Sequence, residues 1–228
     1  MLKDLLGPYT MSGSYEIVLH SHPVRLRDIP LGEKVFFVVR DPLERFVSAF
    51  NYRLREGRPH QYDPWTDAER VAFAAFQSPD ALGAALSSGE AETRARAMAA
   101  MIAIRHVRDS YWRWFDNLEY LERRRDDLLL AVWLPDLTAT VPQLLSMLGL
   151  PAQIAAPQSE ASANRSPEDA PRALGDTATA NLRQWYGADD AFLDYCAALP
   201  VFAGPSWSRD RTSAHHRSQA PAALERSV

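Results

Sequence analysis

One segment, residues 34–57, constrains the fold most strongly: KVFFVVRDPLERFVSAFNYRLREG. It opens with Lys34–Val39, a run of β-branched and aromatic residues that is typical of a strand buried on both faces. An amphipathic helix is predicted directly after it, because Asp41 can cap the first turn and Pro42 suits the first helical position. Gly57 is expected to end this helix. Its apolar side chains recur at helical spacing, on Leu43, Phe46, Val47, Phe50 and Leu54.

The remaining sequence alternates between strand-like and helix-like patterns. Two further short runs, Tyr15–His20 and Leu128–Leu134, predict strands. Helical patterns cover Asp67–Phe76, Asp80–Leu86, Glu90–Ile104, Leu118–Arg125, Pro135–Leu148 and Asp176–Leu199. This alternation predicts an α/β fold with a parallel sheet that helices cover. Residues 1–199 suffice for one such domain, and residues 200–228 have the composition of a disordered tail.

Composition argues against several classes of protein. The formal net charge is −4, so no global field favours nucleic acid, although a pocket for a small polyanion needs only a few cations. Cys196 is the single cysteine, so the chain has no internal disulfide and no cysteine cluster for zinc. We expect no metal site. Neither a signal peptide nor an apolar run of membrane length is visible, and a soluble cytoplasmic protein is the default expectation.

Two polar side chains follow the Lys34–Val39 strand. Ligands of parallel α/β folds bind beyond the carboxyl ends of the strands, and Arg40 stands at such an end. Ser48 lies two turns into the next helix, off the apolar stripe. A guanidinium, a hydroxyl and the free N–H groups of the helix could bind one phosphate. The alternative is that Arg40 pairs with Asp41 or Glu44 and that Ser48 is merely exposed.

The same segment resembles the 3′-phosphate-binding signature of sulfotransferases that use 3′-phosphoadenosine-5′-phosphosulfate. That signature is an apolar strand followed by R-D-P-x-x-R-F/L-x-S, and the match here begins at Arg40. The resemblance implies that Arg40 and Ser48 hold the 3′-phosphate of the donor, with Arg45 at the other basic position. Arg45 could instead cap the helix or form a surface ion pair. The implied fold is a P-loop-like, three-layer α/β domain with a central parallel sheet, and the implied reaction transfers a sulfuryl group to a hydroxyl, without a metal.

Two histidines, His20 and His22, precede this segment. Sulfuryl transfer needs a base near the acceptor hydroxyl, and an imidazole suits this role because its unperturbed pKa of roughly 6.5 lies near the working pH. Two residues that are two apart on an extended segment point to opposite faces. A structural histidine or a metal ligand is the alternative. Heparan sulfate and uronyl 2-O-sulfotransferases carry histidines at the matching place, which implies His22 as the base, His20 as the second choice and a carbohydrate acceptor. Ser21 and Pro23 depart from that pattern.

Two further segments fit the resemblance less specifically. Arg165 and Ser166 lie in the late loop where family members place groups near the donor, and the alternative is a solvated loop. Arg105–Trp112 combines cations with aromatic faces, as acceptor-sugar sites often do. Its alternative role is a helix end that packs on the core.

A second signature of these sulfotransferases, P-K-x-G/A-G/S-T, does not occur in the sequence. Its backbone N–H groups and lysine hold the 5′-phosphosulfate. Met1–Tyr9 is similar to the helix that should follow this loop, so we expect the chain to begin just after it and to lack the N-terminal strand. One hypothesis is a sulfotransferase whose 228-residue form has little activity. The other is a truncated, non-catalytic protein that binds the nucleotide or a glycan. A P-loop kinase is disfavoured because G-x-x-x-x-G-K-S/T is absent.

Overall fold

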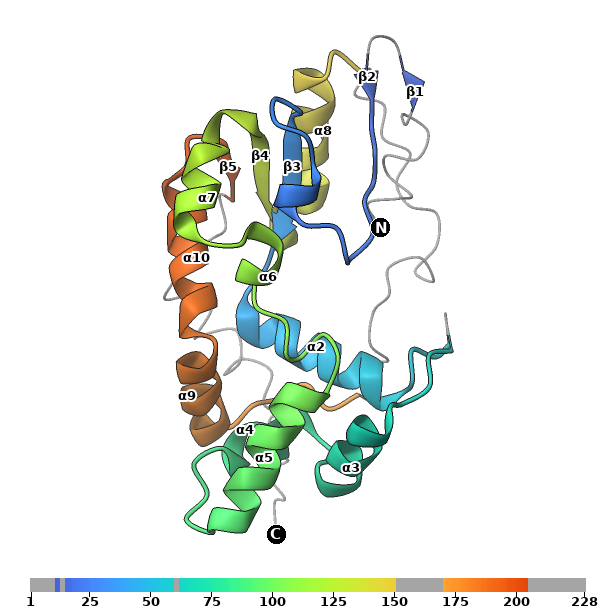
Figure 1. The fold of residues 1–228 in the computed structure, drawn as a ribbon, viewed down its shortest axis with the longest axis vertical. Helices are drawn as coiled ribbons and strands as arrows, with labels where there is room; N and C mark the ends of the chain where they lie inside the picture. Colours follow the sequence, from blue (N-terminus) through green and yellow to red (C-terminus); the bar gives the residue numbers. More distant parts are fainter. Residues whose placement is uncertain (1–10, 13–14, 60–61, 151–169, 205–228) are drawn as a thin grey trace, which may run out of the picture.

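The centre of the molecule is a three-stranded parallel sheet with the strand order β3-β4-β5 (Figure 1). The structure is a computed structural model that describes residues 11–12, 15–59, 62–150 and 170–204. The strands are Val35–Val39 for β3, Leu128–Trp133 for β4 and Phe202–Ala203 for β5. Val39 pairs with Trp133, so the carboxyl ends of β3 and β4 lie together. The predicted strands at Lys34–Val39 and Leu128–Leu134 are therefore confirmed.

Helices cover both faces of this sheet (Figure 1). Helix α8 packs on one face, and α6, α7 and α10 pack on the other. Their bounds are Leu137–Met147 for α8, Trp112–Phe115 for α6, Leu118–Arg123 for α7 and Gly187–Ala198 for α10. Side chains of β3 alternate between the two faces: Phe36 and Val38 join the α8 cluster, whereas Val35, Phe37 and Val39 join the other. The expected α/β class is confirmed.

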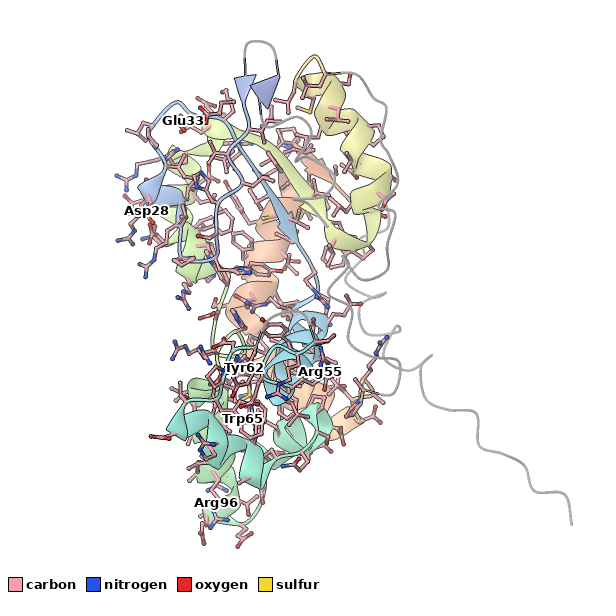
Figure 2. The ribbon with its side chains drawn as sticks, turned by 90° about the vertical axis from the view of Figure 1, so that its right-hand side faces the viewer. Asp28, Glu33, Arg55, Tyr62, Trp65 and Arg96 are labelled. Carbon is pink, nitrogen blue, oxygen red and sulfur yellow. The ribbon has the colours of Figure 1, made fainter. Side chains whose placement is uncertain are left out.

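A second part of the molecule is helical and lies beyond the carboxyl end of β3 (Figure 1). Its helices are α2 (Pro42–Leu54), α3 (Asp67–Ala75), α4 (Pro79–Ala85), α5 (Ala91–Ala103) and α9 (Asp176–Trp185). The predicted apolar stripe of α2 is buried in their common core. Figure 2 shows the same division, with Asp28 and Glu33 on the sheet part and Tyr62, Trp65 and Arg96 on the helical part. Helix α2 follows β3 after two residues and so joins the two parts.

The strand predicted at Tyr15–His20 is wrong in extent and in pairing. Only Tyr15–Glu16 forms a strand, β2, and it pairs antiparallel with β1 (Met11–Ser12) outside the main sheet. The β-branched and aromatic content of this segment suits a strand, but Ile17 and Leu19 pack on the α8 side of the sheet while Val18 is exposed. The segment is thus buried on one side without strand pairing beyond Glu16. Short 3₁₀ turns cover Leu26–Asp28, Arg125–Asp127 and Leu134–Asp136.

The sheet takes its third strand from beyond the domain boundary expected at residue 199. On β4, Ala131 pairs with Phe202 and Val132 pairs with Ala203. Two residues are too few for a periodic signal, which is why the sequence pattern missed β5. Residues 205–228 lie outside the described residues, so the tail stays a prediction. Across the described ranges, no helix combines the length and the apolar character that crossing a membrane requires.

A buried ion cluster fixes the far end of α2 to α3. The guanidinium of Arg53 is fully buried and donates to both carboxylate oxygens of Glu69, at 2.8 and 2.9 Å. Arg105 also donates to Glu69, and both arginines bind the Asp63 carboxylate. Burial alone raises the pKa of Glu69, but hydrogen bonds from Arg53, the Thr66 backbone and Arg105 outweigh it and lower this pKa to about 2.

We predict that Glu69→Gln lowers the free energy of unfolding by about 3–5 kcal/mol at pH 7, because it removes the buried carboxylate that pairs with Arg53 and leaves that cation only the partly exposed Asp63. Because the folded pKa of Glu69 lies below its unfolded value, its contribution is present above about pH 4.5 and is lost as the pH falls toward 2. The variant should therefore show a flatter acid dependence in urea unfolding. The exposed Glu92→Gln is the matched control and should cost less than about 1 kcal/mol. Equal stability of Glu69→Gln and wild type would contradict the cluster's role.

Candidate functional site

Arg40 lies where β3 ends and the helical part begins. The Tyr111 hydroxyl holds its backbone from both sides: it accepts a hydrogen bond from the Arg40 N–H at 2.9 Å and donates to the Arg40 carbonyl at 2.8 Å. The Tyr111 ring is buried and stacks on Phe192, with centroids 5.0 Å apart. Burial raises the pKa of Tyr111 to about 12, so the hydroxyl keeps the proton that it donates.

The guanidinium of Arg40 has little to neutralise it. Its Nη2 donates to the Glu44 carbonyl at 2.7 Å, whereas its buried Nε forms no hydrogen bond. Neither Asp41 nor Glu44 forms an ion pair with it, within the part of the chain that the structure describes. Burial lowers the pKa of the Arg40 guanidinium, and the charge of Glu44 opposes that shift. The site therefore holds a poorly hydrated cation.

Ser48 lies on α2, one turn after the residue that the Arg40 guanidinium contacts. In an α-helix the carbonyl of residue 44 is the acceptor for the N–H of residue 48, so the guanidinium on the Glu44 carbonyl lies one turn before Ser48. Helical side chains tilt toward the N-terminus, which directs the Ser48 hydroxyl to that turn. Ser48 is half-buried, and its hydroxyl forms no hydrogen bond to another described residue. Arg40 and Ser48 thus share the turn of α2 that contains the Glu44 carbonyl.

The N–H groups at the start of α2 are already occupied, contrary to the expectation that they are free for a phosphate. The buried Asp41 carboxylate accepts from Leu43 N at 2.8 Å and from Glu44 N at 3.1 Å. It also binds the Arg183 guanidinium of α9 at 2.6 Å. The cap itself was predicted, and Asp41 fills the positive end of the helix that a ligand would need.

Arg45 has a buried partner of its own. Its guanidinium forms an ion pair with Asp189 of α10 and donates to the Asp109 carbonyl. The rings of Tyr111 and Tyr186 flank it, with centroids 4.7 and 5.4 Å from its central carbon. This arrangement matches the ion-pair alternative, except that the pair lies inside the molecule rather than at its surface. Arg45 therefore positions α2.

The two predicted histidines lie in different surroundings. Both are exposed, and they follow a segment that is not a strand, so no pleat fixes their directions. The His22 ring lies 5.6 Å from the ring of His106, and the His22 carbonyl accepts from Trp114 Nε1 at 2.6 Å. His106 in turn lies 6.1 Å from the ring of Tyr52, one turn after Ser48 on α2. No ring contact involves His20 among the described residues.

The candidate residues follow one another along helix α2. Arg40 precedes its first turn, and Ser48 and Tyr52 lie one turn apart on it. The His106 ring contacts both the Tyr52 ring and the His22 ring. Sequence reasoning missed Tyr52 altogether and left His106 within the segment Arg105–Trp112. The helix pattern held a signal for Tyr52, because it is four residues after Ser48 and shares its face.

Of the remaining predicted site residues, Arg105 has a structural role and two others lie outside the described residues. The Arg105 guanidinium binds Glu69 and Asp63, which favours the core-packing alternative for that part of Arg105–Trp112. Arg165 and Ser166 lie outside the described residues. Pro171, the sixth residue after Arg165, accepts a hydrogen bond from Asn51 Nδ2 of α2 at 2.8 Å.

We predict that Tyr111→Phe keeps the fold, because the ring stays in place, and lowers the free energy of unfolding by about 1–3 kcal/mol. The cause is the loss of both hydrogen bonds to the Arg40 backbone, which leaves partly buried polar groups unsatisfied. Chemical denaturation measures this cost. The matched control is Tyr62→Phe on an exposed ring, which should change stability by less than about 0.5 kcal/mol. If the two variants were equally stable, Tyr111 would not be the clamp described.

Comparison with known proteins identifies no relative. No protein-family model matches the chain, and no curated protein or solved structure matches it. The resemblance to sulfotransferases rests on the short motifs around Arg40 and His22, and a functional assignment depends on the geometry of these residues.

Proposed function

We propose that this protein binds 3′-phosphoadenosine-5′-phosphosulfate through Arg40 and Ser48. It then transfers the sulfuryl group of this donor to a hydroxyl group of a carbohydrate. The observation that carries the proposal is the half-buried Arg40 residue, whose buried Nε forms no hydrogen bond and whose Nη2 donates to the Glu44 carbonyl, one helical turn before Ser48. The signature in the sequence names the same two residues.

Electrostatics favour an anion at this place. Removing a guanidinium from water is costly unless an opposite charge or hydrogen bonds replace the lost hydration. The neighbouring cations Arg45 and Arg183 each bind a carboxylate, whereas Arg40 binds only a carbonyl oxygen among the described residues. A phosphate bound to Arg40 supplies the missing charge, and the Ser48 hydroxyl supplies a further donor. The 3′-phosphate is thus held by side chains rather than by the helix N-terminus.

In this proposal His22 is the base. In the transfer, the acceptor oxygen forms a bond to sulfur, the S–O bond to the 5′-phosphate breaks, and adenosine 3′,5′-bisphosphate leaves with the electron pair. The acceptor proton passes to an imidazole nitrogen of His22. The Cβ atoms of residues four apart on a helix are separated by about 6 Å, so Tyr52 lies one turn beyond Ser48 on α2. The His106 ring contacts Tyr52, and the His22 ring contacts His106, so both imidazoles lie at this end of the site. The exposed ring of His22 is open to an acceptor.

A second candidate function is nucleotide binding without turnover. The observation that favours it is the absence of the P-K-x-G/A-G/S-T signature from the sequence. Without such a loop, residues 1–228 provide Arg40 and Ser48 for the 3′-phosphate and no recognisable group for the leaving 5′-phosphate. Losing one pre-organised donor at a developing charge costs about 10²–10³ in rate.

We predict that wild type binds adenosine 3′,5′-bisphosphate in titration calorimetry and that Arg40→Ala binds it roughly 10- to 150-fold more weakly. This range corresponds to about 1.5–3 kcal/mol for one charge-assisted contact. Ser48→Ala should weaken binding less. Adenosine 5′-monophosphate, which lacks the 3′-phosphate, should bind both proteins equally weakly.

The control for this measurement is Arg96→Ala on α5, at the far end of the helical part (Figure 2). It removes the same charge without touching the site and should bind like wild type. The proposal fails if wild type does not bind the bisphosphate, or if Arg40→Ala binds it as tightly.

We also predict slow sulfuryl transfer from radiolabelled donor to a panel of glycans, and its loss in His22→Asn. Loss of a general base typically costs about 10²–10⁴ in rate. His20→Asn is the matched control and should retain the wild-type rate. Unchanged transfer by His22→Asn would show that the base lies elsewhere, and nucleotide binding with no transfer by wild type would support the binding-only function.

A further inference from the structure

Two imidazoles, not one, lie at the Tyr52 end of the site. The rings of His22 and His106 are 5.6 Å apart at an angle of 57°, and His106 also contacts Tyr52 edge-on at 6.1 Å. His22 is exposed, whereas His106 is half-buried beneath it. His106 therefore lies between the proposed base and helix α2.

The backbone presents the His106 ring in a fixed direction. His106 has a φ of 65°, in the left-handed region, which few non-glycine residues adopt. Hydrogen bonds hold the chain on either side of it: Arg105 N donates to Glu69 at 3.1 Å, and Arg108 N donates to the Ile104 carbonyl at 3.1 Å. Backbones in sparsely populated conformations concentrate at functional sites, where the surrounding structure maintains them.

The charges around His106 favour its neutral form. Burial lowers the pKa of His106, and the neighbouring His22, Arg53 and Arg105 lower it further. Asp109 opposes this shift, with its Oδ2 3.9 Å from His106 Nδ1. That carboxylate is also shared with two arginines on its own segment, Arg108 and Arg113. Tyr52 of α2 adds an uncharged ring.

We propose that His106 is a positioning residue for His22: it packs between His22 and Tyr52 of α2 and so fixes the direction of the His22 ring, which takes the acceptor proton. Two adjacent imidazoles resist double protonation because the like charges repel. The catalytic part of this inference rests on the proposed function, in which His22 is the base. The coupling between the rings does not depend on it.

Nuclear magnetic resonance titration of the imidazole signals tests the coupling in the 228-residue protein. In His22→Asn the pKa of His106 should rise relative to wild type, because a neighbour that can carry positive charge is gone. It should remain below 6.5, because partial burial and the cations Arg53 and Arg105 still lower it. His20→Asn should leave the titration of His106 unchanged. If the titration midpoint of His106 were identical in wild type and His22→Asn, the two rings would not be coupled and the proposal would be overturned.

The variant His106→Asn tests the positioning role, since asparagine also adopts the left-handed conformation and the backbone is kept. We expect kcat for sulfuryl transfer to fall by up to about 10²-fold with an altered pH profile, while adenosine 3′,5′-bisphosphate binds as in wild type. Unaltered transfer by a folded His106→Asn would overturn the role. If wild type transfers nothing although the rings are coupled, the catalytic role fails with the proposed function and the pair stands.

Discussion

Two buried ion pairs of opposite polarity hold helix α2, and the candidate site depends on them. Asp41 of α2 binds Arg183 of α9, and Arg45 of α2 binds Asp189 of α10. Because α9 packs in the helical core and α10 packs on the sheet, the same two pairs join both parts of the molecule. The Asp189 carboxylate also accepts hydrogen bonds from Ser110 and from Tyr111 N, so the segment that clamps Arg40 is fixed to the same point.

These pairs determine which charge is left for a ligand. They give Arg45 and Arg183 a carboxylate partner within the protein, although the buried Nε of Arg45 forms no hydrogen bond. Asp41 accepts hydrogen bonds from the N–H groups of Leu43 and Glu44 at the start of α2. The Arg40 guanidinium has only the Glu44 carbonyl as a hydrogen-bond acceptor among the residues that the structure describes. Burying such a group lowers stability unless a ligand completes it, and perturbed groups of this kind concentrate at functional sites. The same two ion pairs therefore stabilise α2 and leave Arg40 available to a ligand.

Local sequence patterns predicted the unit formed by β3 and α2 because its determinants lie within the segment itself. Asp41 caps the turn that immediately follows it, and the apolar stripe needs only helical spacing. The partners of the charged residues could not be predicted in this way. Asp189 is 144 residues from Arg45, and no local pattern distinguishes it from its neighbour Asp190. The contact between His22 and His106 likewise exists only after the chain has folded.

The failures share a physical cause. The β-branched and aromatic residues of Tyr15–His20 suit a strand, yet Ile17 and Leu19 pack on the α8 side of the core without strand pairing. Strand β5 consists of two residues and acquires its structure from β4. In both places tertiary contacts decide the outcome, and these contacts are not visible in a local window.

The central claim is that Arg40 and Ser48 receive a phosphate, and a crystal structure of the protein with adenosine 3′,5′-bisphosphate tests it most directly. The account predicts the 3′-phosphate within hydrogen-bonding distance of the Arg40 guanidinium and the Ser48 hydroxyl, with the adenosine carrying its 5′-phosphate toward Tyr52. Asp41 should still cap α2, and Arg45 should still bind Asp189. A nucleotide bound elsewhere, or a phosphate that replaces Asp41 at the start of α2, would contradict the account.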